Sequence, residues 1–193
     1  PEFATFRGDP RGQDRWTDQS EEAMKARQGH SRIQLAALQS IDRDKLGEPA
    51  QVNYDLLIEQ VKSRIEGFRF PGEYLPINQM GGPQQGLAQM MAITRPKNLQ
   101  DYENMVARLE KAPQIIETAI AWMRKGMAAG VTPPAITLRD VPQQIRNQLV
   151  YEASKSPLLG AFQKFPANVD SLKQDTLKKQ AETAFSEKIA QAF

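Results

Sequence analysis

Residues 70–86 read FPGEYLPINQMGGPQQG, and strongly helical segments lie on either side of them. This stretch holds three of the 13 prolines and four of the 12 glycines, yet it keeps apolar residues that a flexible linker would lack. We therefore predict an ordered connection. Gly81, Gly82 and Pro83 combine free backbone angles with a fixed one, which predicts a tight turn that leads into a helix with Pro83 near its first position. The apolar residues are Tyr74, Leu75, Ile77 and Met80.

Composition bounds the class of protein. With 193 residues, of which 40% are hydrophobic and 25% are charged, the chain can bury one substantial core or two small ones, and we expect one continuous helical unit. The 25 basic and 23 acidic residues are interspersed, so no nucleic-acid partner is expected. The absence of cysteine excludes disulfides and thiolate metal sites. No apolar run approaches the ~20 residues of a transmembrane helix.

The first part of the chain divides into an arm and a helix pair. We predict that residues 1–18 form an irregular arm whose aromatic side chains dock on the body, and that residues 19–69 form two helices. The first helix, capped by Asp18 or Ser20, should run to about Ser40, with its second half buried. Apolar residues at steps of three and four mark the second helix. The aromatic residues of the arm are Phe3, Phe6 and Trp16, and the stripe of the second helix is Tyr54, Leu57, Val61, Ile65 and Phe68.

After the connection at residues 70–86, residues 87–193 are predicted to be a helical remainder. A short helix begins at Pro83, and Asn98 caps the next one. Pro113 is predicted to end that helix and to begin another, because a proline inside a helix costs ~3 kcal/mol. Gly130 stands where a left-handed C-terminal cap is expected.

The last predicted helix begins near Asp170 or Ser171 and carries apolar residues at steps of four up to the final residue. No terminating signal follows, which predicts that the chain is truncated at Phe193. We therefore expect an uncovered apolar stripe that binds either the C-terminal remainder of the same protein or a second copy through the last helix. The stripe comprises Leu177, Ala181, Phe185, Ile189 and Phe193. Together these elements predict an all-α fold, an irregular array of about seven to eight helices with ordered Pro/Gly-rich connections.

Residue types that carry chemistry are scarce. His30 is the single histidine, and without cysteine it cannot assemble a zinc site, so we predict neither a metal site nor a catalytic residue in this chain. Asp42 and Asp44 lack the rest of a calcium-loop pattern. No nucleophile elbow, Walker loop or dinucleotide motif is present. The methionines either line an adaptable groove or pack in the core.

Three blocks of sequence resemble one bacterial family. These blocks are residues 54–57 (YDLL), residues 66–70 (EGFRF) and residues 75–83 (LPINQMGGP), and they resemble the family catalogued as domain of unknown function 885. Further matching blocks, among them residues 107–109 and 126–134, extend the resemblance over essentially the whole chain. The resemblance implies that this is the N-terminal part of a larger, mostly helical, metallopeptidase-like fold.

The resemblance also implies a function and a location. Proteins of this kind are zinc-metallopeptidase-like and carry a His-Glu-x-x-x-Gly-His-type motif in their C-terminal half, and these 193 residues hold none of it. Zinc and the general-base glutamate would therefore lie outside this chain, which would be inactive alone and would form part of a cleft for a peptide substrate. Such proteins are often exported, so the resemblance implies the bacterial periplasm, secretion or a membrane-anchored lipoprotein, although this chain contains no signal.

The resemblance also points to a candidate site in the connection. Asn78, Gln79, Met80, Gly81 and Gly82 would supply backbone and amide hydrogen bonds at the edge of the substrate cleft. The alternative that this turn only packs against the rest of the fold stays open, because buried turns also use asparagine and glycine. A second hypothesis is a stand-alone helical interaction module, whose surfaces rich in methionine and aromatic residues bind a partner.

Overall fold

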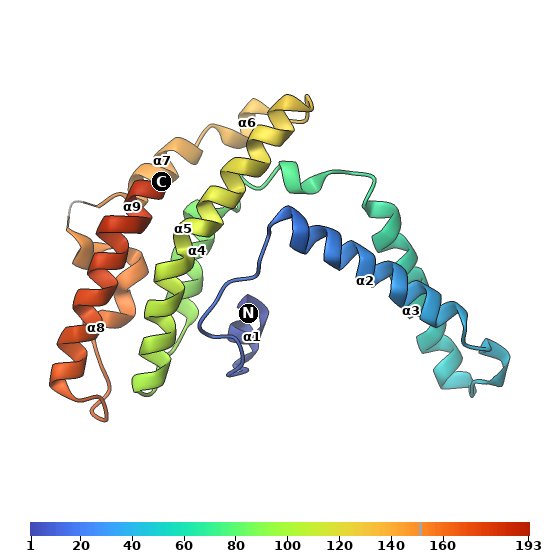
Figure 1. The fold of residues 1–193 in the computed structure, drawn as a ribbon, viewed down its shortest axis with the longest axis horizontal. Coiled ribbons are helices and arrows are strands. Elements are labelled where there is room, and N and C mark those ends of the chain that lie inside the picture. Colours follow the sequence, from blue (N-terminus) through green and yellow to red (C-terminus); the bar gives the residue numbers. More distant parts are fainter. Residues whose placement is uncertain (151) are drawn as a thin grey trace. The chain divides into compact units, whose positions relative to one another are not determined.

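The computed structural model describes residues 1–150 and 152–193 and confirms the all-α prediction (Figure 1). Within these residues the only regular structure besides helices is one antiparallel bridge between Asn78 and Gly81. The chain divides into two compact units, Gln19–Gly72, here called the hairpin unit, and Pro1–Asp18 with Glu73–Phe193, here called the main unit. None of the described helices is long and apolar enough to cross a membrane.

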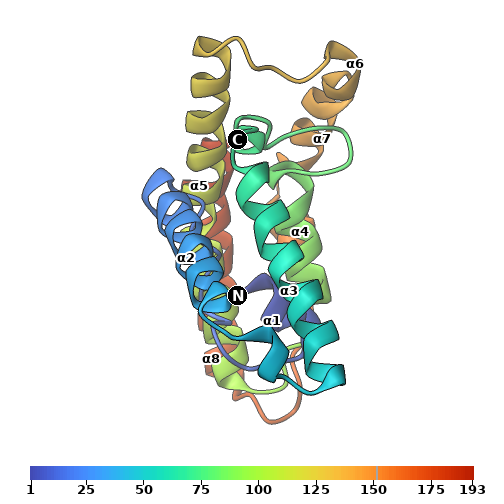
Figure 2. The same ribbon diagram turned by 90° about the vertical axis from the view of Figure 1, so that its right-hand side faces the viewer.

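The hairpin unit consists of two antiparallel helices, α2 (Glu21–Gln39) and α3 (Glu48–Gly67), with the short 3-10 helix η1 (Arg43–Lys45) between them (Figure 2). Helix α2 begins as predicted, because the Ser20 hydroxyl accepts a hydrogen bond from the Ala23 N–H at 3.3 Å. Helix α3 corresponds to the second predicted helix.

The core of the hairpin unit is small. Val61 is its one buried apolar residue, and all residues of this unit are described. The prediction that the second half of α2 is buried is wrong, since the Ile33 side chain is 68% exposed and Ser31 is the buried residue of that helix. Two helices share a single interface, so an apolar residue on the other side of either helix has nothing within the hairpin to cover it.

The main unit begins with a helix where an irregular arm was predicted. Helix α1 (Glu2–Arg7) occupies part of residues 1–18. Docking by aromatic side chains is confirmed for Trp16, which packs against the core and donates its indole N–H to the Arg108 carbonyl oxygen at 2.8 Å. The prediction of docking is wrong for Phe3 and Phe6, because both side chains are mostly exposed.

Helix α4 (Pro83–Ile93) and helix α5 (Leu99–Ala128) follow, and Asn98 caps α5 as predicted. The prediction that Pro113 ends a helix is wrong, because α5 continues through it. Buried residues recur at steps of three and four on both sides of this proline, and their burial outweighs the ~3 kcal/mol that it costs. These residues are Tyr102, Met105, Leu109, Ala112, Ile116 and Ala119. Gly130, with φ 71°, follows the helix in the predicted left-handed conformation.

The remaining elements are short apart from the last helix. Helix α8 (Ser171–Ala184) begins after its predicted cap Asp170, whose carboxylate accepts a hydrogen bond from the Leu172 N–H at 3.0 Å. A π-helical turn, η5 (Phe185–Ile189), continues it into α9 (Ala190–Ala192). The other short elements are η2 (Gly72–Tyr74), α6 (Ala135–Leu138), α7 (Val141–Gln148), η3 (Ala153–Lys155) and η4 (Pro157–Gln163).

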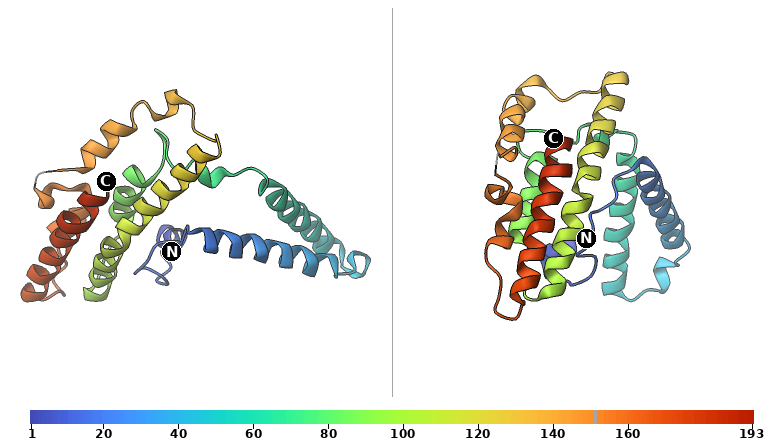
Figure 3. Two further views of the ribbon diagram at one scale, coloured as in Figure 1. Left: turned by 45° about the horizontal axis from the view of Figure 1, so that its top comes forward. Right: turned by 60° about the vertical axis from the view of Figure 1, so that its left-hand side comes forward.

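Helix α8 and its continuation lie beside α5 and bury the predicted stripe (Figure 3). The expectation of an uncovered stripe is wrong, since its members join the core of the main unit formed with α5 and η4. Leu177, Ala181, Phe185 and Ile189 are buried, and Phe193 packs against the same core.

Candidate functional site

The predicted turn is closed by its own hydrogen bonds. The Asn78 N–H donates to the Gly81 carbonyl oxygen at 2.9 Å, and the Gly81 N–H donates back at 3.3 Å. The Asn78 side-chain oxygen accepts hydrogen bonds from the N–H groups of Met80 at 2.8 Å and Gly81 at 3.1 Å. The side chain of Met80 is 85% exposed. The turn therefore presents one apolar side chain to solvent on a well-fixed backbone.

The backbone of Gln79 fastens the turn to neighbouring elements. Its N–H donates to the Thr137 carbonyl oxygen in α6 at 2.8 Å. Its carbonyl oxygen accepts hydrogen bonds from the side-chain amides of Gln85 in α4 and Gln144 in α7, both at 3.0 Å. Most polar groups of the turn are thus used within the fold, which supports a packing role for Asn78 and Gln79.

Gln84 is a residue of this site that sequence reasoning missed. It is buried, and its side-chain amide donates to the carbonyl oxygens of Asn78 at 2.9 Å and Gly81 at 3.3 Å and to the Gln144 side chain at 3.1 Å. The other atom of its amide group, Oε1, lies against Gly82, where a Cβ atom would come within 2.4 Å of it. Gln84, in the first helical turn of α4, therefore fixes the position of the loop at residues 78–81.

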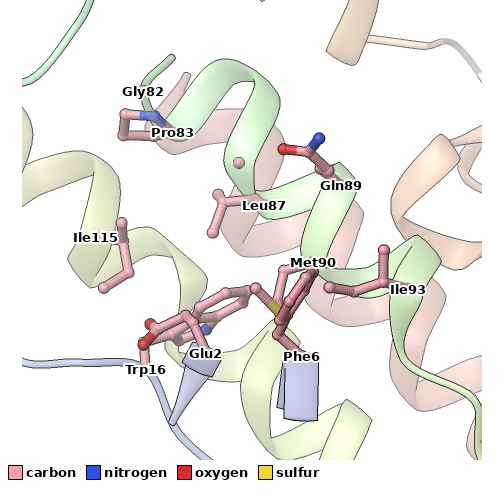
Figure 4. Close-up of a pocket in the computed structure, with 11 residues that line it drawn as sticks. Glu2, Phe6, Trp16, Gly82, Pro83, Leu87, Gln89, Met90, Ile93 and Ile115 are labelled. Carbon is pink, nitrogen blue, oxygen red and sulfur yellow. The ribbon is translucent and has the colours of Figure 1, made fainter. Parts of the chain in front are cut away.

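A cavity of about 450 Å³ lies between α1, the segment around Trp16, α4 and α5 (Figure 4). We call it the α4 cavity. Only one of the five predicted site residues, Gly82, lines this cavity. The next residue, Pro83, is also part of the lining and begins α4. Its walls are mainly apolar, formed by Phe6, Trp16, Leu87, Met90, Ile93 and Ile115.

Glu2 also lines the α4 cavity, and its carboxylate is held in place. One carboxylate oxygen accepts the Thr17 backbone N–H at 2.8 Å, and the other accepts the Thr17 hydroxyl. Burial raises the pKa of Glu2, but the hydrogen bonds to its carboxylate, mainly from Thr17, together with the nearby ammonium of Pro1 leave the pKa below its ordinary value. Glu2 therefore carries a negative charge at neutral pH.

Arg108 latches the N-terminal segment onto α5. It is fully buried, and its guanidinium donates to the Arg15 carbonyl oxygen at 3.1 Å and to the Thr5 hydroxyl at 2.8 Å. It also lies over the Trp16 ring, 5.4 Å from the ring centre. Burial lowers the pKa of Arg108, and nearby carboxylates oppose that shift. The wall of the α4 cavity that carries Glu2, Phe6 and Trp16 depends on this latch.

Metal-binding side chains do not gather in the described part of the chain. Among residues 1–150 and 152–193, no group of three or more His, Cys, Asp or Glu side chains could hold a metal ion. His30 lies exposed in α2. The described residues therefore do not fit a zinc ion.

Comparison with known families gives a match over the whole chain. A family model described as "Bacterial protein of unknown function (DUF885)" matches residues 1–193, the whole chain. No curated protein matches the chain. The match confirms the resemblance, and its description names no activity.

Proposed function

We propose, because the chain belongs to the DUF885 family, that it is the non-catalytic helical portion of a zinc-dependent, peptidase-like hydrolase and forms part of its substrate cleft. In this proposal the zinc ligands and the general-base glutamate lie outside these 193 residues. The protein works in the bacterial periplasm, or as a secreted or membrane-anchored lipoprotein. The C-terminal remainder of that protein is its structural partner, and a peptide is its substrate.

The observation that carries this proposal is an apolar cavity directly beside the predicted turn. Gly82 belongs both to the turn and to the lining of the α4 cavity, and the exposed Met80 side chain stands two residues before it. A cavity of about 450 Å³ falls within the size range of ligand sites. We assign the cavity to an apolar side chain of the peptide and Met80 to a contact with the neighbouring part of that peptide.

Photo-crosslinking tests the proposal on this chain. A peptide that carries a benzophenone side chain, which reacts readily with methionine, is irradiated with the chain, and the attached residues are mapped by mass spectrometry. We expect attachment at Met80 and Met90, and we expect Met80→Ser to reduce it. Met127→Ser is the matched control, because Met127 is also mostly exposed but lies in α5. Equal labelling of Met127 and Met80 would contradict the proposal.

One observation favours the alternative, a helical interaction module with an unidentified partner. In the hairpin unit the apolar side chains Val52 and Leu56 lie four residues apart in α3 and are mostly exposed. Residues at this spacing share a helix face, which suits contact with another helix. The double variant Val52→Lys, Leu56→Lys separates the two functions, since it would abolish partner binding and leave peptide crosslinking at Met80 unchanged.

A further inference from the structure

We propose that the α4 cavity binds an apolar ligand that carries a protonated amine, such as an arylalkylamine. The cavity combines an aromatic and aliphatic interior with one fixed negative charge, and an arylalkylamine presents the complementary pair of groups. This inference does not depend on the peptidase assignment, because it concerns binding by this chain alone.

The interior of the cavity suits an aromatic ring. Phe6 from α1, Met90 from α4 and the Trp16 ring point toward one another across it (Figure 4). Aromatic faces and a methionine sulfur make favourable contacts with a ring, and aromatic faces also attract cations. Phe6 is 76% exposed although its neighbours are apolar, so a ligand in the cavity would cover surface that water now contacts.

The negative charge of Glu2 favours a ligand with a positively charged head group. Glu2 is the one ionisable side chain among the residues that line the cavity, and Thr17 holds both of its carboxylate oxygens in a fixed orientation. The ammonium group of Pro1 lies 3.8 Å from one of these oxygens, so a ligand ammonium would share the carboxylate with it. Each oxygen has a further lone pair, so the carboxylate can still accept a hydrogen bond from an ammonium group. The buried guanidinium of Arg108 is not part of the lining. It donates hydrogen bonds to Arg15 and Thr5 and lies over the Trp16 ring, while its Nη1 has no hydrogen-bond partner and its charge interacts with Glu2.

Three indole compounds of matched shape test the charge requirement by titration calorimetry. Tryptamine carries an ammonium group, tryptophol a hydroxyl and indole-3-acetate a carboxylate. We expect tryptamine to bind about fivefold more tightly than tryptophol and indole-3-acetate to bind most weakly, as a partly desolvated charge contact implies. Glu2→Gln should remove the preference for tryptamine while tryptophol still binds, which shows that the cavity itself is intact.

A second pair of variants tests the location. A Cβ at Gly86, which lines the cavity from α4, would meet no atom within 4 Å, so Gly86→Trp can fold and should block all three compounds. Gly29→Trp is the matched control, because Gly29 is also an unobstructed helical glycine but lies in α2. The proposal is overturned if tryptamine and tryptophol bind equally, if tryptamine produces no binding heat, or if Gly86→Trp leaves tryptamine binding unchanged.

Discussion

At the scale of single residues, Gly82 sets the path of the chain into α4. Its φ of 134° and ψ of 176° lie in a region that essentially only glycine adopts, and an added Cβ would crowd Gln84, Ile77 and the Pro76 carbonyl oxygen. We predict that Gly82→Ala lowers the free energy of unfolding by about 2–3 kcal/mol. Gly81→Ala is the control, since its Cβ would meet no atom within 4 Å, and it should change stability little. Urea unfolding followed by tryptophan fluorescence measures both, because both tryptophans belong to the main unit.

Glu2 gives stability a defined dependence on pH. Its pKa in the folded chain lies below the reference value of 4.5, so its contribution is fully present above that value and is lost as the pH falls through the folded pKa. Glu2→Gln should therefore flatten the loss of stability below about pH 4.5. The free energy of unfolding is compared for the two proteins across a pH series. An unchanged slope in Glu2→Gln would show that Thr17 does not stabilise the charged carboxylate.

Single residues also show where sequence reasoning stops. The turn, its glycines and the position of Pro83 followed from local backbone chemistry. Gln84 and Arg108 did not, because their burial depends on groups up to 103 positions away, as in the hydrogen bond from Arg108 to Thr5. One signal was available for Arg108, namely a charged residue three positions after Met105 and four before Ala112, on the inward side of the helix.

At the scale of elements, α5 shows that a proline can lie inside a helix when packing on both sides requires the helix to continue. Pro113 lacks the N–H that would bond to the Leu109 carbonyl oxygen. We predict that Pro113→Ala raises the free energy of unfolding by about 1 kcal/mol, the recovered hydrogen bond being partly offset by a more flexible unfolded chain. Urea unfolding measures this change. A clear loss of stability would mean that the proline ring itself contributes to packing.

The same helix explains why the prediction of a helix end at Pro113 was wrong. Local rules treat proline as a helix end, and that rule placed a boundary at residue 113. The apolar spacing from Tyr102 through Leu109 to Ile116 continues in phase across it. Periodicity is the stronger signal here, because it reports the tertiary contacts that decide whether the proline is tolerated.

At the scale of the whole molecule, the burial of the last helix is the main difference from the sequence-based expectation. The stripe itself was predicted correctly, but periodicity shows only which face is apolar and not which element covers it. We predict that Phe185→Ala lowers the free energy of unfolding by about 3–5 kcal/mol. Leu172→Ala, in the preceding helix α8, is the control, because Leu172 is 76% exposed and its loss should matter little. Equal effects of the two substitutions would show that the stripe is uncovered.

The α4 cavity could not have been predicted from the sequence for the same reason. Its lining comes from residues 2–16, from residues 82–93 and from Ile115, which only the packing of α1, α4 and α5 brings together. Among the predicted site residues, Gly82 alone lies at the edge of this cavity. The ionised Glu2 in the opposite wall, and the buried Arg108 that holds this wall against α5, became recognisable only from their hydrogen-bond partners.

The central claim is that the α4 cavity is the ligand-binding surface of this chain, and the methyl groups of its seven methionines can test it by NMR. An apolar tetrapeptide with a free amino terminus is titrated into protein that carries ¹³C-labelled methionine methyls. The account predicts shifts at Met90, which lines the cavity, and at Met80 in the adjacent turn, while Met24 in α2 and Met127 near the end of α5 stay unchanged. Shifts at Met24 or Met127 without any at Met90 would contradict the account.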